Sequence, residues 1–175
     1  MKKNFILPGL YEHFDLLKYL LFLYENHKDF FIENINFRAI YGNFQFCTWD
    51  GGRVFPNYNH ANIEKVIEIK DFFNQKNIPI RLIFTNNLIT ENDCYEHFNN
   101  LILQVCENSL NEIVINSPIL EKYIKKEYPL YHFVSSTTKC ITNQIDMINE
   151  LQKEYSMICI DYNLNHKKEL LFNLS

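Results

Sequence analysis

Glycine is scarce in this chain, and the glycine-rich motifs of nucleotide-binding proteins are missing. There are 4 glycines among 175 residues. Neither G-x-G-x-x-G nor a P-loop occurs, and the G-x-S-x-G motif of serine hydrolases is missing as well. Dinucleotide binding, nucleoside-triphosphate binding and serine-hydrolase chemistry therefore lack their usual sequence support.

Paired cysteines and metal-binding spacings are also missing. The 5 cysteines form no C-x-x-C pair, and neither they nor the 6 histidines show the short spacing of a zinc site. We therefore expect no metal and no cofactor within this chain. An odd, scattered cysteine count favours free thiols in a reducing cytoplasm. Most of these thiols should be buried, and Cys47, in an aromatic loop, is the one to test for reactivity. The cysteines are Cys47, Cys94, Cys106, Cys140 and Cys159.

The chain has no basic stripe and no long hydrophobic run. Its 17 basic and 21 acidic residues are mixed along the sequence and give a net charge of −4. That distribution argues against a nucleic-acid partner. The most apolar stretch, residues 16–24, is far shorter than the roughly 20 residues that cross a bilayer. No membrane partner is expected.

What the sequence does contain is a regular alternation of strand-like and helix-like segments. Short β-branched or aromatic runs occur at residues 37–41, 80–84, 112–115, 131–134 and 157–160, each followed by a polar turn and an amphipathic stretch. Strands that alternate with helices usually lie parallel, because each crossover returns the chain to the same starting edge. The sequence predicts one α/β domain over residues 1–175, with a leading helix at 9–32 and parallel βα repeats over 37–175.

The number of strands is small for a closed barrel. A (β/α)₈ barrel usually takes about 250 residues and eight strands, whereas five runs are visible here. We therefore expect either an open parallel sheet or a partial TIM-like barrel. Unpaired edges, together with 15 Phe and 11 Tyr, predict self-association or burial against a further C-terminal domain. Cys159, inside the last run, should be nearly inaccessible because parallel sheets are covered on both faces.

The turns after the five runs are polar and should gather at one edge of the sheet. Parallel α/β folds bind ligands at the carboxyl ends of their strands. We expect a small polar or anionic ligand there, held by groups that orient it and stabilise charge; none of them is an evident proton-transfer or redox centre. The candidate residues are Tyr41, Arg53, Asn86, Asn116, Ser135, Ser136, Asp161 and Asn163.

Each of these features also has a purely structural interpretation. Residues 135–138 can form a capping cluster that satisfies its own turn, and Asp161 can cap the segment that follows it. Residues 49–53 suit a lid that closes on an anionic or planar ligand, but equally a structural loop. The alternative function is a protein-interaction module that uses the apolar leading helix and the aromatic loop at 43–60.

Several strand ends resemble those of the collagenase-like peptidase family. Tyr41-Gly42 with the downstream Arg53 is similar to the family's first strand and its arginine, and Asn86 to the asparagine after the second. Ser136-Thr137 with Asn143 is similar to its Ser-Thr-Gln and Asn. The resemblance covers residues 37–165 and implies the N-terminal part of a TIM barrel, which in several branches carries an iron–sulfur cluster and RNA- or quinone-modifying activity.

This chain departs from that family at two strand ends. Asn116 stands where the family tends to have aspartate, and residues 161–163 stand where it tends to have Arg-Glu. The family's cluster cysteines belong to a region beyond residue 175. The resemblance therefore implies a ligand-binding or catalytic scaffold, with no nucleophile or metal motif for proteolysis in these residues.

Overall fold

A computed structural model describes residues 3–51 and 62–169 of the chain. Six strands lie parallel in one sheet, in the same order as in the sequence. They are β1 (Lys3–Pro8), β2 (Ile35–Gly42), β3 (Ile80–Phe84), β4 (Glu112–Ile115), β5 (His132–Ser135) and β6 (Met157–Ile158). The helices are α1 (Phe14–Asn26), α2 (Ile63–Gln75), α3 (His97–Cys106), α4 (Pro118–Glu127) and α5 (Gln144–Leu151).

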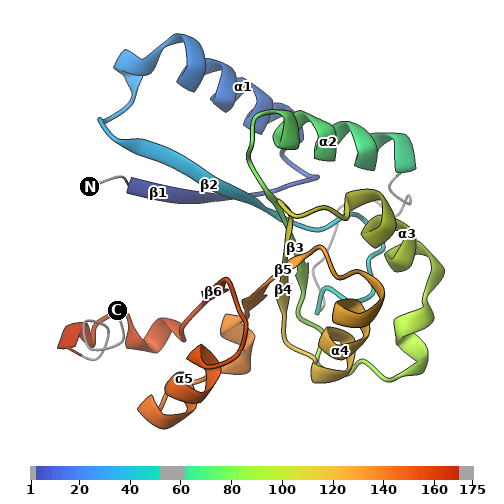
Figure 1. Cartoon of the computed structure of the whole chain (residues 1–175). Coiled ribbons are helices and arrows are strands. Elements are labelled where there is room, and N and C mark those ends of the chain that lie inside the picture. The colour runs from blue at the N-terminus through green and yellow to red at the C-terminus, as the bar shows by residue number, and fades with distance from the viewer. Residues whose placement is uncertain (1–2, 52–61, 170–175) are drawn as a thin grey trace.

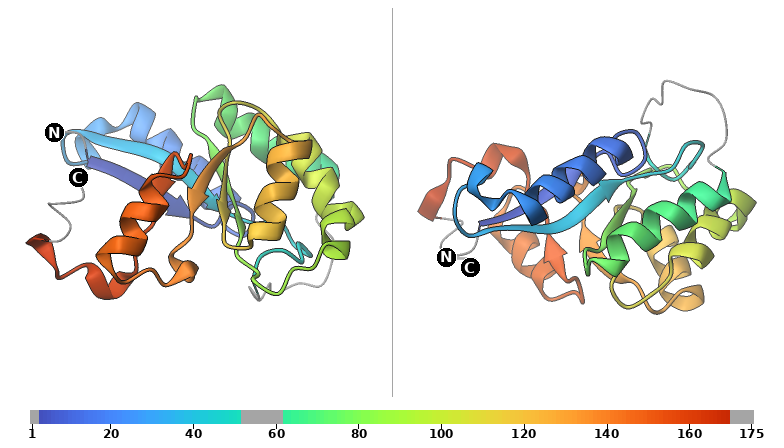
Figure 2. Two further views of the ribbon diagram at one scale, coloured as in Figure 1. Left: turned by 60° about the horizontal axis from the view of Figure 1, so that its bottom comes forward. Right: turned by 90° about the horizontal axis from the view of Figure 1, so that it is seen from above.

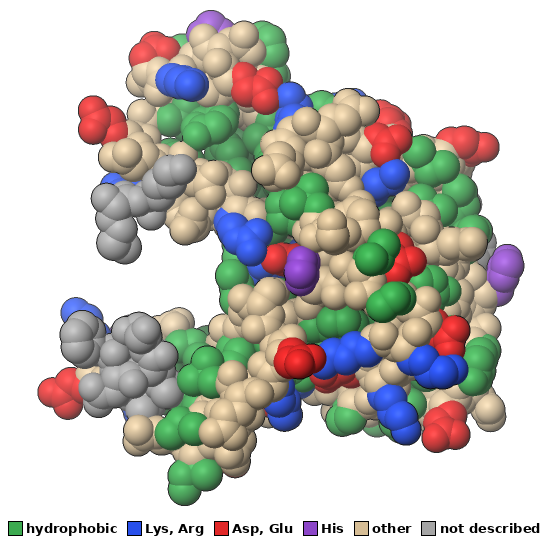
Figure 3. All heavy atoms as spheres, viewed as in Figure 1, with side chains coloured by type: hydrophobic (Ala, Val, Ile, Leu, Met, Phe, Trp, Pro, Cys, Tyr) green, Lys and Arg blue, Asp and Glu red, His purple; other side chains and the backbone are tan. Residues whose placement is uncertain are grey.

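The sheet curls into a half-barrel with its helices on the convex side (Figures 1 and 2). Every neighbouring pair of strands is parallel, from β1 with β2 to β5 with β6. The predicted partial TIM-like barrel is thus confirmed. The space-filling view shows a hollow between the N-terminal elements and the C-terminal segment, where a closed barrel would continue (Figure 3). The concave face of the sheet is therefore accessible.

The first strand is missing from the sequence prediction, and the leading helix is shorter than expected. Residues 3–8 pair with β2 along their whole length. Gly9 then turns the chain with a φ of +89°, and a β-carbon there would lie 2.5 Å from the His13 ring. Only glycine fits such a turn. The predicted helix at 9–32 is in fact α1, followed by a short 3₁₀ segment at Lys28–Phe30.

The helix-facing side of the sheet forms the core. Ile80, Leu82 and Phe84 alternate along β3 and are fully buried, as period-two geometry requires for one face of a strand. Trp49, from the loop after β2, is also fully buried. Its ring lies edge-on to Phe84 at 5.3 Å, and its Nε1 donates a hydrogen bond to the Asp93 carbonyl at 3.0 Å.

The described part of the loop at 43–60 lies largely in the core. Phe44, Cys47 and Trp49 are buried there, whereas Phe46 is 37% exposed. Burial also raises the pKa of the Cys47 thiol far above its ordinary value, which disfavours the reactive thiolate at this position. Residues 52–60, and with them Arg53, lie outside the described residues.

Side chains cap the starts of α3, α4 and α5. Ser117 caps α4 by accepting from the Leu120 amide, with Pro118 at the first position, as sequence preference predicts. Glu96 caps α3, which follows a 3₁₀ segment at Asn92–Tyr95. Asn143 caps α5.

The last strand is also shorter than predicted. The run at 157–160 contributes only Met157 and Ile158 to β6, which is the edge of the sheet. Cys159 is partly exposed, not buried. An edge strand lacks a neighbour on one side, and this one also borders the open concave face, so the double coverage assumed for a parallel sheet does not apply.

Candidate functional site

A pocket of about 570 Å³ opens on the concave face at the carboxyl ends of the strands. Its walls come from β1 to β4, from the loop after β2 and from the segments after β3, β5 and β6. Two of the predicted site residues, Tyr41 and Ser136, line it. Ligand pockets of this size are common in proteins. The other polar residues of the lining are Asp50, Arg81, Thr85, Thr137 and Thr138.

Arg81 lies in the wall of this pocket and belongs to a buried charged group. Its Nε donates to Glu112 Oε2 at 2.7 Å, and Arg38 donates to Glu112 Oε1 at 3.0 Å. The side chains of Arg81 and Glu112 are each 3% exposed. One carboxylate thus pairs with two guanidinium groups, which leaves one positive charge in excess.

An irregularity in β2 separates Arg38 from its neighbours. Phe5 pairs with Phe37 and Ile6 pairs with Ala39, so Arg38 has no opposite residue in β1. Such a bulge re-aims the side chain of the extra residue. Arg81 and Glu112 are themselves direct neighbours in the register of β3 and β4. Strand register and one bulge therefore bring together three residues that are up to 74 positions apart.

The donors of Arg81 are only partly used by the protein. Its NH1 group has the Met157 sulfur as its partner at 3.6 Å, and a thioether is a weak acceptor. Its NH2 group lies 2.5 Å from Glu112 Oε2 but makes no well-directed hydrogen bond there. Buried charged donors are costly unless they are hydrogen-bonded. A ligand oxyanion in the pocket would offer the NH1 group a stronger acceptor than this thioether.

Close contacts between the loop after β2 and the end of β3 fix one wall of the pocket. Thr85 Oγ1 donates to the Asp50 carbonyl at 3.0 Å. Gly51 has a φ of +76°, and a β-carbon there would lie 2.8 Å from Thr85 Oγ1. The loop after β2 can approach β3 this closely only because residue 51 is glycine.

The serine and threonine cluster serves both the turn and the pocket. Ser136 Oγ accepts from the Thr138 amide at 3.1 Å and lies 2.8 Å from Thr138 Oγ1. These contacts are the capping interpretation of the cluster. Thr137, in contrast, is exposed, lines the pocket, and its hydroxyl makes no hydrogen bond with the described residues.

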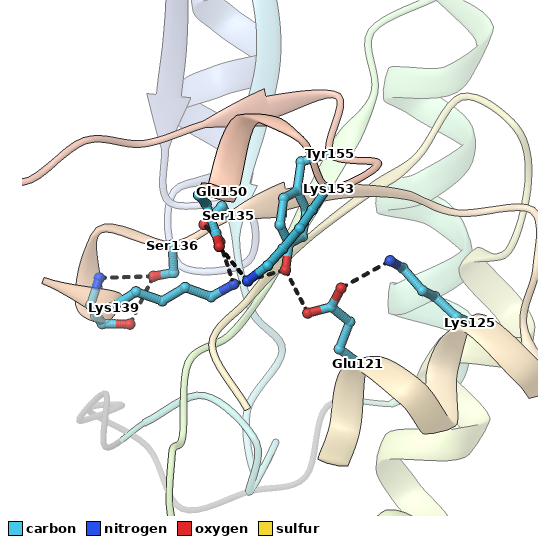
Figure 4. A network of polar contacts seen from close by, with 9 residues as sticks. Glu121, Lys125, Ser135, Ser136, Lys139, Glu150, Lys153 and Tyr155 are labelled. Carbon is cyan, nitrogen blue, oxygen red and sulfur yellow. Dashed lines mark hydrogen bonds and ion pairs between the residues drawn. The ribbon is translucent and has the colours of Figure 1, made fainter. Parts of the chain in front are cut away.

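Ser135 faces away from the concave pocket, toward α5. Its Oγ donates to the buried carboxylate of Glu150, which also pairs with Lys139 at 2.7 Å and Lys153 at 2.5 Å (Figure 4). Burial alone would raise the pKa of Glu150, but the hydrogen bonds from the two lysines and Ser135 outweigh it and lower the pKa to about 2. Ser135 thus helps to hold a buried carboxylate ionised.

The other predicted residues are not brought together by the fold. Asn86 bridges the Thr48 carbonyl and the Leu88 amide. Asp161 caps the 3₁₀ segment at Tyr162–Leu164 by accepting from the amide of Asn163, and the Asn163 side chain is exposed. Asn116 lines a second, separate cleft on the convex side. Of the predicted residues that the structure describes, only Tyr41 and Ser136 therefore share the concave pocket.

Arg38, Arg81 and Glu112 lie within the strands and not at the turns where the site was predicted. The sequence does contain a sign of this charged group, because Arg81 and Glu112 belong to strand-like runs, 80–84 and 112–115, that are otherwise apolar. Arginine and glutamate are almost never fully buried unless they are paired. A charge of each sign in adjacent strands of a parallel sheet therefore predicts that the two side chains meet.

Two kinds of site have no support in the part of the chain that the structure describes. No group of three or more His, Cys, Asp and Glu is arranged to hold a metal ion there. Among the same residues, no helix has the length and apolar character to cross a membrane. Comparisons with family profiles, with curated proteins and with solved structures found no match for this chain.

Proposed function

We propose that this half-barrel is a scaffold domain that binds a small anionic ligand, best a carboxylate, in its concave pocket. The observation that carries the proposal is the excess positive charge of the group formed by Arg38, Glu112 and Arg81. Arg81 lines the pocket, and among the described residues its NH1 group has only a thioether as its partner. Guanidinium groups bind carboxylates and phosphates with matched donor geometry.

The rest of the pocket suits such a ligand. Thr137 offers a hydroxyl that has no hydrogen-bond partner among the described residues, and Ile83 and Val114 supply an apolar wall. An anion that contacts Arg81 would also lie at the strand ends where (β/α) barrels place their ligands. The resemblance of residues 37–165 to the N-terminal part of a collagenase-like peptidase barrel agrees with this placement. These residues can orient a ligand and stabilise charge.

The test is titration of the protein with a panel of acetate, succinate and citrate, followed by calorimetry and by amide shifts in NMR spectra. We expect saturable binding of at least one member, with shifts at residues 81–85 and 136–138. Thr137→Val removes only an unused hydroxyl and should weaken binding a few-fold. Ser109→Ala, at an exposed position outside the pocket, is the control. Shifts confined to other parts of the protein would refute the proposal.

A second function, docking of a partner protein, is favoured by an aromatic row on the outer side of α1. Tyr19 and Phe22 stack at 6.4 Å, and Phe22 contacts His27, which stacks on Phe30 at 5.3 Å. Tyr19, Phe22 and Phe30 are 60%, 52% and 69% exposed. Contiguous exposed apolar groups often mark interaction sites.

Sedimentation at micromolar concentration tests whether that partner is a second copy. Self-association that Phe22→Ser and Phe30→Ser abolish would support the docking surface. A monomer at all concentrations would leave the concave pocket as the function of the chain and would argue against the expected self-association.

A further inference from the structure

A second cleft, on the convex side of the sheet, gathers basic side chains in a chain of net charge −4. It has a volume of about 880 Å³ and lies between α4 and the segment that leads into and out of α5. Its lining includes five lysines and a single carboxylate, Glu121. The lysines are Lys122, Lys125, Lys126, Lys139 and Lys153.

Two of these lysines are held in place by ion pairs with the buried carboxylate of Glu150. Lys139 and Lys153 both pair with it, and Lys139 also donates to the Tyr155 hydroxyl at 2.8 Å. Tyr155 in turn donates to Glu121 at 2.6 Å (Figure 4). The side chain of Glu150 is 3% exposed. Fixed ammonium groups lose less conformational entropy on binding than free surface lysines.

The carboxylates do not neutralise the cleft. Lys125 pairs with Glu121 at 2.9 Å and Lys126 with Glu127 at 2.6 Å. When Glu150 is counted as well, five lysines stand against three carboxylates, which leaves an excess of two positive charges. Lys122 is exposed and forms no ion pair with the described residues.

The mouth of the cleft adds one uncharged donor group just before α4. Asn116 lines it, and its side-chain amide makes no hydrogen bond with the described residues. Lysine is a common phosphate ligand that acts as a point charge. A hollow with two excess positive charges and the amide of Asn116 suits an oxyanion that carries at least two negative charges.

We propose that the cleft lined by Lys122, Lys125, Lys126, Lys139 and Lys153 is a binding site for a small phosphorylated compound with two or more phosphate charges. The arrangement favours this over a nucleic acid, because the lysines face the cleft from α4 on one side and from the two ends of α5 on the other, and do not form a stripe along the surface. The proposal is independent of the concave pocket, since the two sets of lining residues have no member in common.

The experiment is calorimetric titration of the intact chain with pyrophosphate, inorganic phosphate and citrate. We expect saturable binding of pyrophosphate that weakens as salt is raised, weaker binding of inorganic phosphate, and weaker binding of citrate. The double variant Lys122→Gln and Lys126→Gln should lose roughly tenfold in pyrophosphate affinity. It leaves the lysines on Glu150 untouched, so folding is preserved.

The matched control removes two lysines elsewhere. Lys65→Gln with Lys76→Gln makes the same change in net charge in α2 and at the residue that follows it, where each lysine has a surface ion pair. This control should bind pyrophosphate like the original chain. An equal loss in the control double variant, or no saturable binding at all, would overturn the proposal.

Discussion

The two faces of the sheet are built for different purposes, and β3 shows both. Ile80, Leu82 and Phe84 point to the helices and are fully buried. Arg81 and Ile83, between them, line the concave pocket. In a closed TIM barrel the inward face is filled by layers of mostly apolar side chains. Here the inward face carries a charged group instead, because the half-barrel leaves it open to solvent and ligand.

The convex side of the sheet supplies most of the stability of the fold. Burial of apolar area is the main favourable term in folding, and it belongs to the convex side. The group of Arg38, Glu112 and Arg81 contributes less, because desolvation of the charges offsets much of their attraction. Burying these charges costs desolvation free energy, and such a charged group on the accessible face of a sheet is typical of a functional surface.

The largest effect is expected from Phe84→Ala. It removes a fully buried ring that packs on Trp49, and it should lower the free energy of unfolding by about 4 kcal/mol. Val114→Ala, on the concave face, is the comparison and should cost about 1 kcal/mol, because that side chain is only partly buried. Urea unfolding followed by circular dichroism measures both. Equal losses would mean that the two faces contribute alike.

Glu112→Gln should destabilise the protein by about 3 kcal/mol. It leaves Arg81 buried without a carboxylate, and breaking one side of a buried ion pair is strongly unfavourable. The control is Arg38→Gln, which should cost less than about 1 kcal/mol because the Arg38 side chain is 38% exposed. Unfolding at neutral pH gives both values. If Glu112→Gln were neutral, the charged group would be solvated and the case for an anion at Arg81 would weaken.

The Glu150 network predicts a pH dependence on the convex side. The pKa of Glu150 is lowered from 4.5 to about 2 in the folded state. Its contribution to stability is therefore fully present above pH 4.5 and is lost as the pH falls toward 2. Glu150→Gln should be less stable by about 2 kcal/mol at neutral pH, and this deficit should shrink through that window.

Glu154→Gln is the control for that pH dependence, because Glu154 is exposed and close in sequence. Its unfolding midpoint should follow that of the original chain from neutral pH down to pH 3. A deficit of Glu150→Gln that stayed constant across the acid range would show that Glu150 acts by packing and not by charge.

The smallest effect is a difference in thiol reactivity between the two faces. Cys159 lines the concave pocket, whereas Cys106 is buried under the helices. Labelling is done in a Cys140→Ser variant, because Cys140 is exposed. Burial raises the pKa of both thiols, that of Cys106 to about 12. Native labelling should modify Cys159 at least about tenfold faster than Cys106. Mass spectrometry of the modified peptides measures this ratio, and comparable rates would contradict an open concave face.

The sequence determined the strand and helix alternation, and with it the parallel sheet. β3 and β4 occur at the residues that their apolar runs predict, 80–84 and 112–115, and α4 begins at its Ser-Pro cap. These features depend on near neighbours in the chain, on period-two burial and on capping. β1 was missed because residues 3–8 are mostly exposed at the edge of the sheet and show little of the burial pattern that marks a strand.

The tertiary structure alone decided which residues share a site. Asn86 and Asp161 follow strands, as predicted, but hydrogen bonds to backbone groups use their side chains. Arg38, Arg81 and Glu112 meet because of register and a bulge. Local sequence patterns specify which face of a strand is apolar. They do not specify the curl of the sheet, which results from long-range packing and leaves this concave face open.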